Sequence, residues 1–149
     1  MADPALLRVI HVAGAVLLLG NVTVTGFWAA YLYRARRQVP FRPVARAILW
    51  TDLVFTLAGA AMLAVSGVLL IRVRGYTVAD TPWLRQGIAA FVVSTLLWLA
   101  FLLPDQWRLE RIDPADEAGL ERLFRRWSAV GWSATTLLFY GLWVMVSKR

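Results

Sequence analysis

One histidine and one aspartate stand inside long apolar stretches of this 149-residue chain, and these two residues are the main candidates for chemistry. His11 is the only histidine, and the chain has no cysteine. A neutral imidazole can bind haem iron or another metal ion, while an intramembrane carboxylate such as Asp52 can carry a proton. Ionisable residues within apolar membrane segments are costly and usually functional, so both positions need an explanation.

Two interpretations of His11 follow from its surroundings in the sequence. As a functional residue it would be an axial haem ligand or a metal ligand, and Met145 at a similar depth in the last apolar stretch would complete a His–Met pair. Arg72, Arg85 and Lys148 fall at the same membrane face and would hold haem propionates. As a structural residue, His11 would bond a neighbouring carbonyl or hydroxyl, Met145 would pack, and the basic residues would anchor to headgroups.

Asp52 needs a partner, a proton or water, because an ionised and unpaired carboxylate inside a membrane is costly. We expect structural pairing with an arginine near the same membrane face or with a hydroxyl group. The candidate partners are Arg46, Arg125, Arg126, Thr25 and Ser128. The functional alternative is a proton-transfer group. Asn21 and Thr25 would either line a small pathway or form a hydrogen-bonded seam between helices.

Four long apolar stretches must position these residues. They cover about residues 5–33, 44–71, 83–103 and 123–146, and each exceeds the roughly 20 residues needed to cross a bilayer core. The hydrophobic fraction is 60% and the mean hydropathy is +0.62, above the values of ordinary soluble domains. The sequence therefore predicts an all-α fold, in which residues 1–149 form a single transmembrane domain built as an antiparallel four-helix bundle.

Start and stop signals support these boundaries. A proline, which suits the first helical turn, stands near the start of each span, at Pro4, Pro43, Pro82 and Pro114. The predicted N-caps are Asp3, Thr81 and Asp113. We expect Pro104 to end the third span, and residues 113–127 to form an amphipathic segment at the interface that runs into the fourth.

Two spans carry stripes of polar and small residues that should face the bundle interior, because lipid cannot satisfy polar groups. At 100° per residue, the stripe on the first span contains His11, Gly14, Leu18, Asn21, Thr25 and Trp28. The stripe on the second span contains Asp52, Phe55, Gly59, Met62 and Ser66. Small residues let helices approach closely, so the second span is predicted to be central in packing.

The net charge of +7 comes mainly from arginines at the span ends, where they anchor to anionic lipid headgroups. This placement argues against nucleic-acid binding. Ten of the 16 Lys and Arg residues fall in or beside the loops after the first and third spans, so both termini are predicted to face away from the cytoplasm. The sequence contains no nucleotide-binding or hydrolase motif, and without cysteine it forms no disulfide or thiolate metal site.

Three segments resemble one family over nearly the whole chain. This is an uncharacterised bacterial family of small four-helix integral membrane proteins. The similar segments are Leu6–Asn21, Leu103–Leu109 and Leu142–Lys148. The family is distantly similar to CopD-type copper-resistance membrane proteins and to HemJ, the haem-containing protoporphyrinogen oxidase. The resemblance to HemJ implies that His11 is a haem ligand, although the HemJ motif after the first-span glycine is replaced here by residues 21–28.

The leading hypothesis is a haem b-binding redox protein of the bacterial inner membrane with His11 as an axial ligand. A homodimer would supply a second His11 as the other ligand. The rival hypothesis is a non-catalytic subunit or scaffold of a larger membrane complex. A third hypothesis, with no broken helix or inverted repeat to support it, is a small transporter or proton pathway using Asp52 and Asn21. Whether the protein is an enzyme is left open by the sequence.

Overall fold

The computed structural model describes residues 3–113 and 115–148 of the chain. These residues form four long helical rods and no strand, which confirms the predicted all-α class. The first rod is α1 (Pro4–Arg34) and the last is α6 (Glu117–Ser147). All four rods are long and apolar enough to span a membrane.

Each of the two middle rods contains one π-helical segment. The second rod consists of α2 (Phe41–Thr51), the π-helix η1 (Asp52–Thr56) and α3 (Leu57–Arg74). The third rod consists of α4 (Pro82–Leu97), the π-helix η2 (Trp98–Leu102) and α5 (Leu103–Arg111). Short π-helical segments inside longer helices are rare and frequently occur at functional sites.

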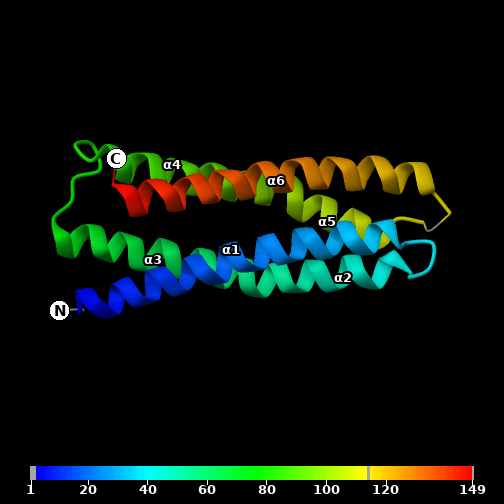
Figure 1. The fold of residues 1–149 in the computed structure, drawn as a ribbon, viewed down its shortest axis with the longest axis horizontal. Helices are drawn as coiled ribbons and strands as arrows, with labels where there is room; N and C mark the ends of the chain where they lie inside the picture. The colour runs from blue at the N-terminus through cyan, green and yellow to red at the C-terminus, as the bar shows by residue number, and fades with distance from the viewer. Residues whose placement is uncertain (1–2, 114, 149) are drawn as a thin grey trace.

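Consecutive rods run antiparallel, as predicted (Figure 1). Both termini and the link between α3 and α4 lie at one end of the bundle, here called the terminal end. The α1–α2 and α5–α6 links lie at the opposite end, here called the loop end. Rods of 30 to 34 residues rise about 45–50 Å at 1.5 Å per residue, which exceeds the thickness of a bilayer core.

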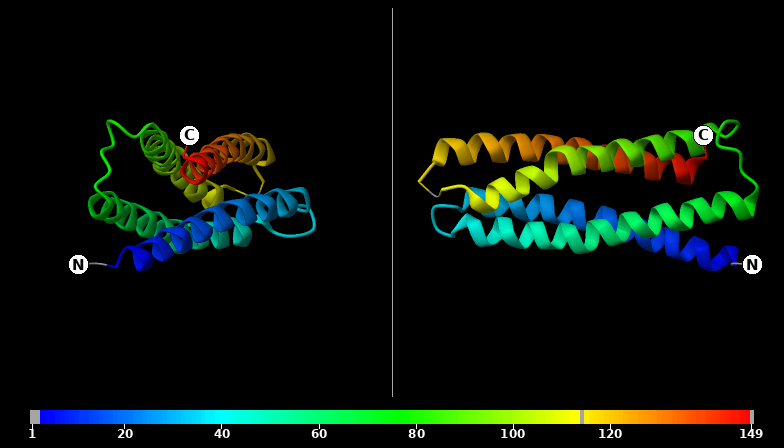
Figure 2. Two further views of the ribbon diagram at one scale, coloured as in Figure 1. Left: turned by 60° about the vertical axis from the view of Figure 1, so that its left-hand side comes forward. Right: turned by 180° about the vertical axis from the view of Figure 1, so that it is seen from behind.

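The bundle is built from two helix pairs. α1 packs along α3 and α4 packs along α6, whereas within the described chain no Cα atom of α3 lies within 8 Å of one in α4 or α6. The pairs meet toward the loop end, where α2 contacts α5, and they diverge toward the terminal end (Figure 2). The main cluster of buried apolar side chains includes Phe41, Phe124 and Trp127, so the core lies toward the loop end.

Glycines allow α1 and α3 to approach closely, in agreement with the packing predicted for the second span. A Cβ atom on Gly14 would lie 2.8 Å from the Cβ atom of Met62. One on Gly59 would lie 2.8 Å from the backbone nitrogen of Leu18. Neither position has room for a side chain, so the two backbones pack directly against each other at this crossing.

The cap of the last helix differs from the prediction, while the first agrees with it. Asp3 precedes α1 and accepts a hydrogen bond from the N–H of the residue two positions later at 2.9 Å. Thr81 precedes α4 without a capping hydrogen bond from its hydroxyl. Asp116, not Asp113, caps α6, because Asp113 instead closes a turn with the second residue after it. Pro114 lies outside the described residues.

The third rod does not end at Pro104, contrary to the prediction, but continues to Arg111. In a regular helix, the ring of Pro104 would clash with the carbonyl four residues earlier, at Ala100. The π-helix η2 ends two residues before the proline, and the N–H of the following residue, Leu103, donates to the carbonyl of Trp98, five residues back. This wider turn lets the helix pass through the proline.

The π-helix η1 changes which residues of the second rod face the bundle interior. Thr56 is buried, whereas Phe55, a member of the predicted stripe, is 43% exposed. The stripe assumes 100° per residue throughout, but a π turn takes more residues than an α turn, so the interior position moves from Phe55 to Thr56. Trp28 also leaves its predicted stripe and is 57% exposed.

We predict that Gly59→Ala lowers the thermal stability of the detergent-purified protein, because the added methyl group would meet the backbone of α1. Overpacking of this kind typically costs about 1–3 kcal/mol. Gly20→Ala is the matched control, since nothing lies within 4 Å of a Cβ atom at Gly20. The unfolding midpoint, followed by circular dichroism, should fall only for Gly59→Ala, and equal midpoints would contradict the close crossing of α1 and α3.

Candidate functional site

Asp52 lies at the start of η1, is 5% exposed and accepts hydrogen bonds from three helical segments. One carboxylate oxygen, Oδ1, accepts from Asn21 Nδ2 of α1 at 2.8 Å and from Thr56 Oγ1 of η1 at 3.3 Å. The other, Oδ2, accepts from Gln106 Nε2 of α5 at 2.5 Å. Asn21 Nδ2 also donates to Thr56 Oγ1 at 3.0 Å, so the four side chains, here called the Asp52 cluster, form one network.

The predicted ion pair between Asp52 and an arginine is wrong: within the described residues the carboxylate makes none. Arg126 pairs with Asp105 instead, and Arg46 lies 3.6 Å from Glu110. The predicted hydroxyl partner Thr25 reaches only the amide oxygen of Asn21, at 3.4 Å. The partners of Asp52 are therefore two neutral amides and one hydroxyl group, and none of these three residues is among the predicted partners.

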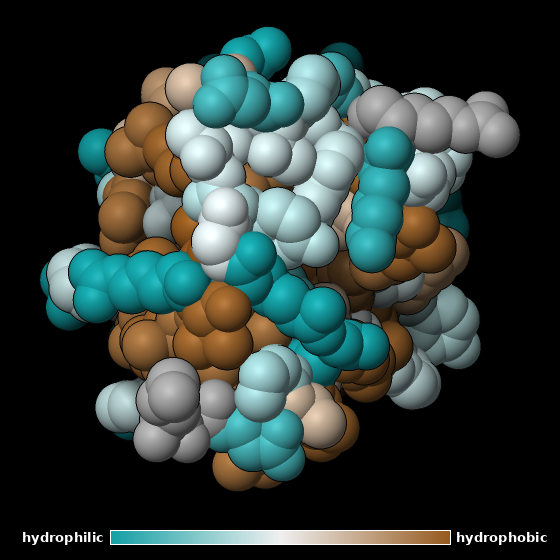
Figure 3. Space-filling model, turned by 90° about the vertical axis from the view of Figure 1, so that its left-hand side faces the viewer, coloured by the Kyte–Doolittle hydropathy of each residue, from teal (hydrophilic) through white to brown (hydrophobic). Residues whose placement is uncertain are grey.

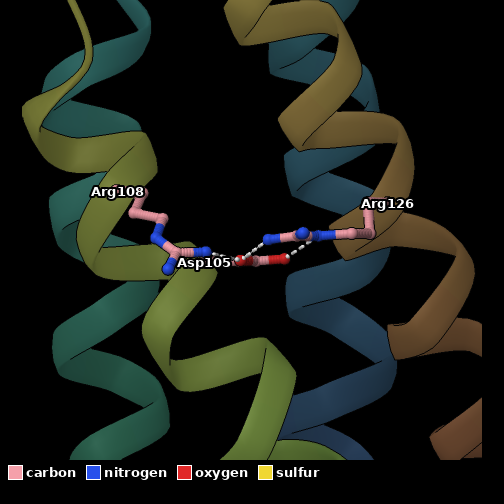
Figure 4. A network of polar contacts seen from close by, with 3 residues as sticks. All are labelled: Asp105, Arg108 and Arg126. Carbon is pink, nitrogen blue, oxygen red and sulfur yellow. Dashed lines mark hydrogen bonds and ion pairs between the residues drawn. The ribbon is translucent and has the colours of Figure 1, made fainter.

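A second buried carboxylate, Asp105 of α5, is 1% exposed and carries the ion pairs of this region (Figure 4). Arg126 of α6 donates to it through two nitrogen atoms: Nε lies 2.8 Å from Oδ2, and Nη2 bonds Oδ1. Arg108 Nη1 adds a contact at 3.3 Å. A two-pronged guanidinium–carboxylate contact is among the strongest side-chain hydrogen-bonding arrangements, so it fixes α5 against α6.

Asp105 and Gln106 are functional candidates that the sequence reasoning missed. These neighbours on α5 bond to different helices, Asp105 to Arg126 of α6 and Gln106 to Asp52 of η1. The signal was present, since both lie in the segment Leu103–Leu109 that carries the family resemblance. Placing the end of the third span at Pro104 excluded them from the membrane interior.

A cavity of about 150 Å³ lies beside the Asp52 cluster. Its wall includes Asp52, and hydroxyl and indole side chains from the surrounding helices also line it: Thr25, Thr56, Ser94, Thr95, Ser128, Thr135, Trp98, Trp127 and Trp132. Predicted residues Thr25 and Ser128 therefore belong to this site, although neither bonds Asp52. The volume corresponds to about five water molecules at roughly 30 Å³ each.

Three buried polar atoms on the cavity wall have no hydrogen-bond partner within the described chain. They are Gln106 Oε1, Trp98 Nε1 and Trp127 Nε1. The Trp98 indole lies beside Asp52 without completing a hydrogen bond to it. Buried polar groups are almost always paired, so these three covered atoms are exceptions among the residues that line the cavity.

His11 lies in the α1–α3 pair, away from the cavity wall. Its Nδ1 atom is 3.0 Å from Ser66 Oγ, and that buried hydroxyl donates to the carbonyl of Met62. A Ser66 hydroxyl that donates to Met62 can accept from Nδ1–H, and this tautomer would leave the lone pair on Nε2. The ring lies over Gly67, where a Cβ atom would be 3.3 Å from Cε1. The bond is the structural one predicted as an alternative, and it also fixes the ring for a ligand at Nε2.

The structure places Met145 in the other helix pair. Its side chain fills the space beside Gly87 of α4, where any Cβ atom would overlap it. His11, in contrast, packs on α3, and in the described chain no Cα atom of α3 lies within 8 Å of one in α4 or α6. The two predicted haem ligands therefore belong to separate helix pairs of one protomer.

The three basic residues predicted to hold propionates lie at the terminal end. Figure 3 shows this end face-on, with hydrophilic side chains lying across a partly hydrophobic surface. Arg72 is exposed in the last turn of α3. Arg85 donates to the carbonyl of Ala79 at 3.0 Å, and the Lys148 amine lies 6.0 Å from the ring centre of Trp83. The described residues contain no group of three or more His, Asp or Glu side chains placed to hold a metal ion.

Residues 5–149 match the family described as "Predicted integral membrane protein (DUF2269)", and the chain belongs to this family. The match confirms the small membrane-protein family predicted from the sequence. Neither a curated protein nor a solved structure matches the chain.

We predict that Asn21→Leu destabilises the protein by about 1–3 kcal/mol, because it removes donors from the buried oxygens of Asp52 and Thr56. Thr25→Val is the control, since its only bond to the cluster is a long one. Thermal unfolding in detergent should rank the proteins wild type, Thr25→Val and Asn21→Leu in falling stability. An Asn21→Leu protein as stable as Thr25→Val would remove the cluster as a stabilising element.

We also predict that Arg126→Gln lowers the unfolding midpoint more than Arg125→Gln does. The first change leaves the buried Asp105 carboxylate without its two-pronged partner, while Arg125 is exposed and has no ion pair in the described chain. Both substitutions remove one positive charge, so the comparison isolates the pairing. Identical midpoints in the same detergent would show that the Asp105–Arg126 contact does not hold α5 to α6.

Proposed function

We propose that this multi-pass membrane protein is a haem b-binding redox protein in which His11 supplies an axial ligand. The observation that carries the proposal is the fixed imidazole: Ser66 Oγ lies 3.0 Å from Nδ1 and orients the ring. A ligating histidine typically has its second ring nitrogen fixed in this way. The distant similarity to HemJ, proposed from the first span, points to the same residue.

The residues present fit one axial ligand for each protomer. Met145 packs against Gly87 in the other helix pair, so we propose that a second copy of the chain supplies its own His11 as the sixth ligand. Arg72, Arg85 and Lys148, at the terminal end, suit the carboxylates of propionates or anionic lipid headgroups. When bound, haem b would supply a one-electron redox centre. Ser66 would orient the imidazole, and the surrounding apolar side chains would exclude water.

We expect the wild-type protein, purified from haem-replete cells, to show a Soret band that sharpens and shifts on reduction with dithionite. His11→Ala should lose this band, because no other histidine is present. Met145→Leu, which keeps the side-chain volume beside Gly87, should retain it. A colourless wild-type protein, or an unchanged spectrum in His11→Ala, would refute the proposed role of His11.

A second candidate function is that of a non-catalytic subunit of a larger membrane complex. The observation that favours it is the distance between α3 and the α4–α6 pair: in the described chain no Cα atom of α3 lies within 8 Å of one in that pair. Purification from native membranes in mild detergent discriminates the two functions. Stoichiometric partner chains with no pigment would support the subunit, and pigmented dimers would support the redox protein.

We place the protein in the bacterial inner membrane with both termini on the non-cytoplasmic side. The support is the excess of arginines at the loop end, since cytoplasmic loops carry more Lys and Arg. Fusions to the C-terminus should therefore be active with alkaline phosphatase, which folds outside the cytoplasm, and dark with green fluorescent protein. The reverse pattern would invert the proposed orientation.

A further inference from the structure

We propose that the cavity beside Asp52 is a binding site for a small organic ammonium ion. His11 does not line the cavity, so this proposal does not depend on haem binding. The argument rests on four features of the wall: its charge, its aromatic rings, its unpaired polar atoms and its size.

Charge favours a cation. Asp52 is the one ionisable residue on the cavity wall, and all of its protein partners in the described chain are neutral. The nearby Arg126 forms its ion pair with Asp105. A carboxylate within a membrane protein is normally paired with a cation or placed beside a solute pathway, and here no protein cation is available to it.

The aromatic side chains favour an organic ammonium over a bare metal ion. Trp98, Trp127 and Trp132 all line the cavity, and tryptophan faces are the best side-chain surfaces for binding ammonium groups. A small metal ion would require several oxygen ligands at close range, whereas Asp52 already accepts three hydrogen bonds. A carboxylate beside indole rings is the chemistry that recognises amines.

Three of the side chains that line the cavity carry a buried polar atom without a partner in the described chain, and binding would pair these atoms. Gln106 donates to Asp52 through Nε2, which leaves its buried Oε1 atom as an acceptor for an ammonium N–H. The indole N–H groups of Trp98 and Trp127 are donors, and a hydroxyl group of the guest or an accompanying water would pair with them. The Gln106 side chain thus connects the charge of Asp52 to the proposed ligand.

The size of the cavity sets the range of ligands. A volume of about 150 Å³ equals the share of about five water molecules, and n-butylammonium has a similar number of non-hydrogen atoms. The two π-helices build the site at this depth, since η1 supplies Asp52 and Thr56 while η2 supplies Trp98. Irregular backbone in membrane helices is found where it is buried in protein or lines a cavity, as it does here.

Calorimetric titration of the full-length protein in detergent tests the proposal, with n-butylammonium, 1-butanol and butyrate as probes and empty micelles as the blank. We expect saturable binding of n-butylammonium, and no saturable binding of the alcohol or the anion. Asp52→Asn should weaken binding about tenfold or more, because it removes the charge that the ammonium pairs with. Glu110→Gln makes the same chemical change away from the cavity and should bind as the wild type does.

A second variant keeps the test decisive if Asp52→Asn does not fold. A Cβ atom at Gly131 would meet only Leu102, at 3.7 Å, and Gly131 lines the cavity, so Gly131→Leu would place a side chain at the cavity wall. We expect this variant to lose saturable binding. No binding by the wild type, equal binding of the alcohol and the amine, or unchanged binding in Gly131→Leu would each overturn the proposal.

Discussion

Inside a bilayer every polar group must find its partners within the protein, and the burial of Asp52 imposes that requirement on most of this bundle. Asn21 brings α1 to the carboxylate, Thr56 places η1 beside it, and Gln106 draws in α5. Directly before Gln106, Asp105 binds Arg126 and so ties α6 to the same segment. The loop half of the bundle therefore combines directional polar contacts between helices with the main apolar core.

The terminal half depends on close packing instead. Gly14 and Gly59 let the backbones of α1 and α3 touch, and Met145 fills the space beside Gly87 between α4 and α6. These contacts act within each helix pair and none of them joins the pairs. The divergence of the two pairs toward the termini follows from this division, because the polar contacts that join them lie near η1, η2 and α5.

The sequence predicts the features that depend on composition and local chemistry. Span number, antiparallel order, the cap at Asp3 and the close approach around Gly59 follow from hydropathy, N-cap preference and residue size. It fails where helix geometry changes. Ending the third span at Pro104 leaves Asp105 and Gln106 outside the predicted membrane segment. The local residues do not indicate that a π turn allows the helix to continue past the proline.

The same limit applies to the partners of Asp52. A uniform 100° per residue places Phe55 in the interior, while the π turn buries Thr56 in its place. Several arginines lie near this depth in the sequence, so charge alone suggests Arg46, Arg125 or Arg126 as the partner of Asp52. The choice of Gln106 instead depends on how α5 rotates after η2, which is a property of tertiary packing that no local pattern encodes.

The separation of the two helix pairs bears on how the chain enters the membrane. Each pair joins the first rod to the second or the third to the fourth, so each is a helical hairpin of two consecutive spans. The first hairpin already contains Asp52 together with Asn21 and Thr56, and it can therefore shelter the carboxylate from lipid before the rest of the chain is made. Gln106 arrives with the second hairpin, where Asp105 and Arg126 pair with each other, so its bond to Asp52 joins the two inserted halves.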